Sequence, residues 1–150
     1  MRFDKTLLIA AILLLACIVS VGAAHAEPQM QFEILTTDEL TDSSRAPPIY
    51  GDVRQDETDT HSYYIDGNKK TFEVSLNWDR GSNDNDLDLQ LHLPNGNILE
   101  FQDQDDGQYN GKITARMSVT SQFANAYWSC SVDGARVIGI QPYTLTMNSY

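Results

Sequence analysis

From residue 49 onward, hydrophobic and polar residues alternate in short runs, and the most regular run lies at 87–93. Every second residue of this run is leucine, and Asp88, Gln90 and His92 stand between the leucines. An alternation with a period of two is typical of a β-strand that has one buried and one solvent-facing side. The Pro-Asn-Gly sequence at 94–96 favours a turn. The run is therefore predicted to be a strand that ends in a turn.

Similar runs recur through the rest of the chain, separated by clusters of Gly, Asn and Asp, without an amphipathic helix of useful length. They predict strands at 49–53, 62–66, 70–78, 87–93, 98–102, 113–119, 127–132 and 143–147. This number of short strands predicts an all-β fold, a jelly-roll-like antiparallel β-sandwich. The predicted core is formed by the hydrophobic side of four strands, with Phe72, Val74, Leu76, Trp78, Leu87, Leu89, Leu91, Leu93, Trp128, Cys130, Val132, Tyr143, Leu145 and Met147.

The N-terminus has the three parts of a secretory signal peptide. Two basic residues precede an apolar run at 7–24, and Ala-His-Ala at 24–26 matches the small-residue rule for cleavage. We therefore expect a signal peptide at 1–26 and a secreted or cell-surface protein. Two alternatives place the protein on a membrane. An apolar run of this length also suits an uncleaved anchor, and Leu-Leu-Ala-Cys at 14–17 resembles a lipoprotein box.

The segment 27–47, between the predicted signal and the first strand, is mixed in composition and weakly periodic. It is predicted to be a tether or a loosely packed N-terminal segment. Within it, 31–35 has the pattern of an edge strand and 37–40 that of a short helix, and the sequence does not choose between them. The β-sandwich domain is predicted to span 48–150.

The chain is strongly acidic, with 21 Asp and Glu residues against 10 Lys and Arg residues and a formal net charge of −11. Such a charge repels nucleic acids and anionic lipid surfaces, so we expect no nucleic-acid partner. Cleavage of the signal would remove Cys17 and leave Cys130 as the remaining cysteine, so no disulfide within the chain is expected. Cys130 alternates with Trp128 and Val132 and is predicted to be a buried thiol.

The order of several short motifs resembles that of a known family. They are Ile-Tyr-Gly-Asp-Val at 49–53, the run at 57–65, Leu-Asn-Trp at 76–78, Asp-Leu-Asp-Leu at 86–89 with its turn, and Pro-Tyr-Thr-Leu-Thr at 142–146. Over 48–148 the chain resembles the bacterial and archaeal pre-peptidase C-terminal (PPC) domains, which are related to the collagen-binding domains of collagenases. The resemblance implies a secreted, non-catalytic jelly-roll module, usually appended to an exported enzyme and, in the collagenase relatives, stabilised by calcium.

No enzyme domain accompanies the module in this sequence. The accessory role that the resemblance implies, to a protease in the same chain, is therefore in question. We expect the module to act by binding, by scaffolding, or as an accessory to an exported protease that is made separately.

Calcium is the sharpest chemical hypothesis, because Ca²⁺ binds several oxygen ligands and two loops are dense in such oxygens. The candidate ligands are Asp79, Asn83, Asp84, Asp86 and Asp88, with a second candidate loop at Asp103, Asp105 and Asp106. Carboxylates this close repel one another unless a cation neutralises them. An EF-hand starting at Asp84 fails, since Leu89 replaces the required Gly and Asn95 the required Glu. Solvated turn residues remain the alternative to a metal site.

Catalytic chemistry has little support in the sequence. His61 and His92 would remain after signal cleavage, and neither lies in a metal-ligand motif such as H-E-x-x-H. No G-x-S-x-G sequence is present. We therefore predict that the protein is not an enzyme, and a small secreted hydrolase is the weakest alternative.

Tyrosines support the stronger alternative, a carbohydrate-binding module. Tyr63 or Tyr64, together with Tyr109 and Tyr127, are candidates for an exposed binding face by their positions in strands or loops. Tyr suits such a face because it combines an apolar ring with a polar tip, although buried tyrosines are as common. The expected partner is an extracellular protein or polysaccharide, with membrane contact only through an uncleaved or lipidated N-terminus.

Overall fold

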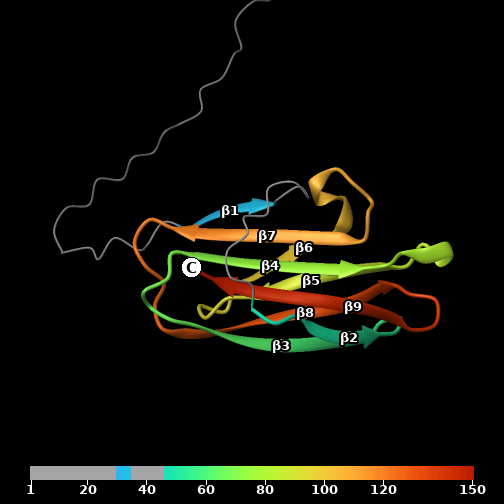
Figure 1. The fold of residues 1–150 in the computed structure, drawn as a ribbon, viewed down its shortest axis with the longest axis horizontal. Coiled ribbons are helices and arrows are strands. Elements are labelled where there is room, and N and C mark those ends of the chain that lie inside the picture. Colours follow the sequence, from blue (N-terminus) through green and yellow to red (C-terminus); the bar gives the residue numbers. More distant parts are fainter. Residues whose placement is uncertain (1–29, 35–45) are drawn as a thin grey trace, which may run out of the picture.

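Nine antiparallel strands in two facing sheets make up most of residues 30–34 and 46–150, which the computed structural model describes (Figure 1). The strands are β1 (Met30–Ile34), β2 (Ile49–Val53), β3 (Thr58–Ile65), β4 (Thr71–Trp78), β5 (Asp86–His92), β6 (Ile98–Phe101), β7 (Lys112–Val119), β8 (Ala126–Arg136) and β9 (Gln141–Ser149). Sheet A has the order β1-β7-β4-β9-β2, and sheet B has the order β3-β8-β5-β6. The prediction of an all-β sandwich is confirmed.

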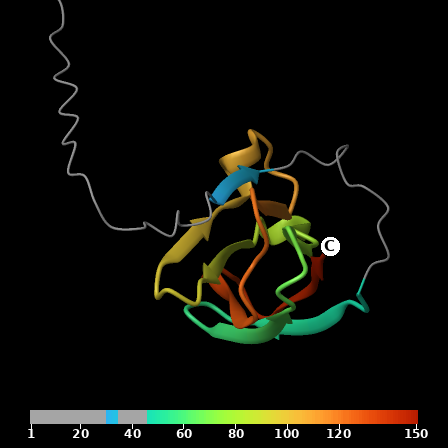
Figure 2. The same cartoon turned by 90° about the vertical axis from the view of Figure 1, so that its left-hand side faces the viewer.

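The connectivity is that of a jelly roll. Four antiparallel pairs are nested along the chain, with β5 beside β6, β4 beside β7, β3 beside β8 and β2 beside β9. The pairs β5–β6 and β3–β8 lie in sheet B, and the pairs β4–β7 and β2–β9 lie in sheet A. This is the order expected when one long hairpin is wrapped into two sheets. Figure 2, which looks along the strands, shows the two layers around the core.

Three strands extend at least two residues beyond a predicted end. β3 begins at Thr58, whereas the sequence pattern placed its start at 62, and β8 continues to Arg136. Both extensions consist largely of polar residues, so they carry no hydrophobic alternation. They form because Thr58 and the residues after it pair with β8, whose Asp133 stands opposite Thr58. β9 also extends beyond its predicted ends, where it pairs with β2 and β4. The pairing partner, not local pattern, sets these ends.

The hydrophobic sides of β2 to β9 form a single core, whereas β1 is exposed along its length. All fourteen predicted core residues are buried, and Leu87, Leu89 and Cys130 are fully inaccessible. Burial of one such leucine contributes roughly 2 kcal/mol to the free energy of unfolding. Burial also raises the pKa of the Cys130 thiol to about 12, so that it stays protonated near neutral pH. The prediction of a buried thiol is confirmed.

β1 lies at the edge of sheet A, where it pairs with β7 from Met30 opposite Val119 to Ile34 opposite Ala115. This pairing agrees with the edge-strand interpretation of the segment that was predicted as a tether. The predicted signal at 1–26 and the alternative helix at 37–40 lie outside the described residues. Within the described part of the chain, no helix is long and apolar enough to cross a membrane.

A tyrosine ring packed over a glycine joins the two sheets near one edge. Gly51 of β2 stands opposite Tyr143 of β9, and a Cβ at Gly51 would lie 2.3 Å from the Tyr143 hydroxyl oxygen. That hydroxyl donates a hydrogen bond to Asp59 Oδ2 (2.6 Å) and lies 2.7 Å from His61 Nε2, both on β3 of the other sheet. Burial, followed by the hydrogen bond to Asp59, raises the pKa of Tyr143 above its usual range.

We predict that Gly51→Ala lowers the free energy of unfolding by about 1–3 kcal/mol, because the new methyl group overlaps the Tyr143 ring. Denaturant unfolding measures the change. In a double-mutant cycle with Tyr143→Ala, the Gly51 substitution should cost much less, since the ring it strikes is gone. An equal cost in both backgrounds would contradict this packing.

Candidate functional site

Arg80 stands at the centre of the first acidic loop, between β4 and β5. Its side chain is largely buried, and its guanidinium group donates hydrogen bonds to Asp84 and to Asp103 Oδ2 (2.7 Å). Asp84 also accepts a hydrogen bond from Arg136 Nη2 (2.7 Å) on its carboxylate, and its carbonyl oxygen accepts two more from the same side chain. Two arginines therefore neutralise this aspartate. The sequence pattern did not identify this role of Arg80.

Asp103 in the second acidic loop is a buried structural anion. Its side chain has no exposed area, and besides the bond from Arg80 it accepts hydrogen bonds from the backbone N–H groups of Asn110, Gly111 and Lys112 (3.1–3.3 Å). A buried carboxylate is stable when it is paired and its lone pairs are satisfied, as here. Asp103 thus fixes the loop that leads into β7.

The neighbouring carboxylates close their own turns. Asp105 accepts a hydrogen bond from the backbone N–H of Gln102 (2.8 Å) in the capping box of the 3₁₀ turn Asp103–Asp106. Asp106 accepts one from Gln108 (2.8 Å), and Asp79 accepts one from Gly81 (2.9 Å). Such local bonds are a common use of Asp in turns. Asn83 ends the other 3₁₀ turn, Gly81–Asn83, and is exposed.

Asp86 and Asp88 differ from the other predicted ligands. They lie on the outer side of β5, and Asp86 Oδ1 is buried without a hydrogen-bond partner among the described residues. Asp88 Oδ2 lies at the long distance of 3.5 Å from Gln102 Nε2, and Asp133 stands opposite Asp88 on β8. Partial burial is the largest cause that raises the pKa of both carboxyls.

The candidate calcium ligands of the first shell and of the second loop therefore have different partners in the structure. Among residues 30–34 and 46–150, no three His, Cys, Asp or Glu side chains are grouped as metal ligands. Asp84 and Asp103 are neutralised by arginine, whereas Asp86 keeps a buried oxygen without a partner. What remains for a cation is the pair Asp86 and Asp88.

Tyr64 and Tyr127 form an exposed pair on the outer face of sheet B. They stand directly opposite each other on β3 and β8, with ring centroids 5.0 Å apart. Their exposed fractions are 46% and 72%. We call these two residues the tyrosine pair. Its position could not be read from the sequence, because the pattern left open which of Tyr63 and Tyr64 faces outward.

Polar side chains continue from the tyrosine pair across the same face in rows set by strand register. The next row holds Ser62, Ser129, His92 and Ile98, and the row after it holds Thr60, Ser131, Gln90 and Glu100. Hydrogen bonds of 3.0 Å join Ser131 Oγ to Thr60 Oγ1 and to His92 Nε2. The face therefore carries hydroxyl, amide, imidazole and carboxylate groups, with an aromatic pair at one end and the exposed Ile98 at the β6 edge.

The other candidate tyrosines lie elsewhere. Tyr63 points inward, packs against Phe72 with ring centroids 5.3 Å apart, and has its hydroxyl 3.2 Å from Ser149 Oγ. Tyr109 is exposed in the loop before β7, with the Arg80 guanidinium 5.3 Å from its ring centroid. Neither residue shares the face that carries the tyrosine pair.

The two histidines lie on opposite sides of sheet B. His61 faces the core side and contacts Tyr143, while His92 faces outward and contacts Ser131. They are therefore not placed to share one metal ion.

No protein-family model matches the chain, and no curated protein matches it. The resemblance to PPC domains therefore stays a prediction from the motifs.

We predict that Asp103→Asn lowers the free energy of unfolding by about 3 kcal/mol or more, because it leaves the largely buried Arg80 without its buried counter-ion. Asp106→Asn is the matched control, since this carboxylate bonds one exposed N–H group and its loss should cost about 0.5 kcal/mol or less. Thermal or denaturant unfolding compares the two variants. Equal effects would show that the Arg80–Asp103 pair does not hold the loop.

Proposed function

We propose that the chain is a non-catalytic, extracellular binding module whose outer face of sheet B contacts an extended polymer. The observation that supports this function is the tyrosine pair, because two adjacent Tyr rings with large exposed fractions, inclined by 59° to each other, offer aromatic surface to a ligand. The predicted signal peptide places the function outside the cell.

Polysaccharide is the polymer class that this face fits best. A pyranose ring has an apolar side that stacks on an aromatic ring, and hydroxyls that bond to side chains such as Ser, Thr, Gln and His. Both kinds of partner lie side by side here, with the tyrosine pair next to the row of Ser62, Ser129 and His92. The net charge of −11 disfavours an anionic polymer. A protein partner, such as a separately made exported protease, is the alternative.

The proposal predicts that the protein is retained on at least one uncharged insoluble polysaccharide. Tyr127→Ala or Tyr64→Ala should weaken retention about tenfold or more, as expected for aromatic anchors of an interface. Tyr109→Ala is the control, because Tyr109 is exposed but lies off this face. Sedimentation with a panel of polysaccharides measures the affinity. Absence of binding across the panel, or an equal loss in the Tyr109 variant, would count against the proposal.

We also propose that Ca²⁺ stabilises the module at Asp86 and Asp88. The support is chemical, since a buried carboxylate oxygen without a partner costs free energy that a hard cation offsets. Calcium would supply positive charge at the edge of the face, where Asp133 stands opposite Asp88 and accepts a hydrogen bond from Thr58. The resemblance to PPC domains favours the same ion.

Calcium at about a hundred times its Kd should raise the free energy of unfolding by about 2.7 kcal/mol. The double variant Asp86→Asn, Asp88→Asn should lose this gain, while Asp106→Asn should keep it. Thermal unfolding in millimolar Ca²⁺ and in EDTA gives the measurement. A wild-type midpoint that is the same in both solutions would rule out the calcium site.

A further inference from the structure

A groove of about 600 Å³ crosses the outer face of sheet A, on the opposite side of the molecule from the tyrosine pair. The groove lies at the end of the sheet where the loop before β7 meets the ends of β4 and β9. Its volume falls in the range of ligand-binding pockets. Neither the sequence pattern nor the proposed contact face on sheet B includes it.

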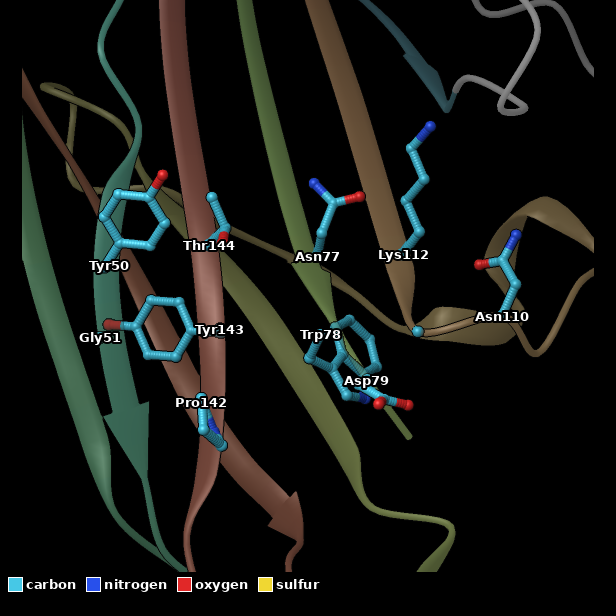
Figure 3. Close-up of a pocket in the computed structure, with 11 residues that line it drawn as sticks. Tyr50, Gly51, Asn77, Trp78, Asp79, Asn110, Lys112, Pro142, Tyr143 and Thr144 are labelled. Atoms are coloured by element: carbon cyan, nitrogen blue, oxygen red, sulfur yellow. The ribbon is translucent and has the colours of Figure 1, made fainter. Parts of the chain in front are cut away.

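One row of side chains, aligned by the register of four strands, lines the groove. Tyr50 on β2 stands opposite Thr144 on β9, Thr144 opposite Asn77 on β4, and Asn77 opposite Lys112 on β7. Figure 3 shows this order from Tyr50 to Lys112 across the sheet. With neighbouring strands about 4.8 Å apart, the row is roughly 14 Å long, which suits an oligomer better than a single small molecule.

The wall of the groove at the Lys112 end is held rigidly. Asn110 borders the groove there, and the buried Asp103 carboxylate accepts hydrogen bonds from the backbone N–H groups of Asn110, Gly111 and Lys112. The Gly111 carbonyl accepts a further bond from Trp78 N–H (2.8 Å). A site held by such bonds loses little conformational entropy on binding.

The groups in the row match those that recognise a sugar chain. The Tyr50 ring is 78% exposed at the open edge of the sheet and offers apolar surface for stacking. Pro142, which stands opposite Asp52 and outside the row, also lines the groove. Thr144 supplies a hydroxyl and Asn77 an amide, which bond to sugar hydroxyls. A lone exposed Tyr needs no explanation, but this one ends a lined groove.

The charged groups that line the groove indicate which charge class of ligand it favours. In a chain of net charge −11, the described residues that line the groove include one cationic side chain, Lys112, and one carboxylate, Asp79, so this part of the lining has no excess of either charge. A locally neutral site inside an acidic protein fits an uncharged ligand and disfavours a polyuronate or an acidic peptide.

We propose that the groove across sheet A is a second binding site, for an uncharged polysaccharide, with Tyr50 as its stacking residue. The chain stacks on Tyr50 and runs along the row toward Lys112, bonding to Thr144 and Asn77. The site is independent of the tyrosine pair, because the two lie on opposite sheets. Together they would let one module hold two sugar chains.

The test is titration of the isotopically labelled protein with soluble, uncharged oligosaccharides, followed by NMR. The expected result is a set of amide shifts at 50–51, 77–79, 110–112 and 142–144. Tyr50→Ala should lower the affinity at these positions at least tenfold, while Tyr50→Phe keeps the ring and should retain it. The exposure of Tyr50 keeps the fold intact in both variants. Tyr127→Ala, on the other sheet, is the matched control and should leave these shifts unchanged.

Each other outcome overturns the groove in a distinct way. Shifts confined to sheet B, and lost in Tyr127→Ala, would rule out binding in the groove but would agree with the proposed function. If no amide shifts with any oligosaccharide, both the proposed function and the binding site in the groove are ruled out. Groove shifts produced by a polyuronate or by peptides, but by no uncharged sugar, would show that the ligand class is wrong. Groove shifts that persist in Tyr50→Ala would show that this ring does not stack on the ligand.

Discussion

The two-residue period of the strands is the constraint on which the rest of the structure depends. Each strand that turns one side chain into the core turns the next toward the other side of its sheet, so a sandwich with one hydrophobic core necessarily has two outer faces. Leu87 and Leu89 are fully buried, and the side chain between them, Asp88, faces out. Strand register then aligns the outward residues in rows. The same pairings that close the core therefore assemble the tyrosine pair on one face and the Tyr50 row on the other.

The acidic loops show how a charged cluster is resolved inside this framework. Arg80 lies between Asp84 and Asp103, and its ion pair with Asp103 supports the backbone that borders the sheet A groove. In these loops Arg80 thus neutralises two carboxylates for which the sequence suggested a metal ion. Only at Asp86 does a buried oxygen lack a partner among the described residues, which narrows the proposed calcium site to the start of β5.

Much of the fold was predictable because it rests on local pattern. Fourteen of the core residues, the positions of eight strands and the outward position of His92 follow from alternation alone. The extensions of β3 and β8 could not be predicted in this way, because the polar residues at 58–61 form a strand only by pairing with a distant partner. The groove was missed for the same reason, since Tyr50, Asn77 and Lys112 are far apart in sequence. Likewise, the sequence does not distinguish Asp103 from Asp86. In the structure, Asp103 pairs with Arg80 and accepts backbone N–H bonds from 110–112, whereas Asp86 keeps a buried oxygen without a partner among the described residues.

The central claim is that both outer faces of a non-catalytic sandwich bind sugar chains. The most direct measurement is the stoichiometry of binding, from isothermal titration calorimetry of the purified protein with a soluble, uncharged oligosaccharide that it recognises. The account predicts two binding sites per chain, one on each sheet. A single site, or no heat of binding with any uncharged oligosaccharide, would contradict it.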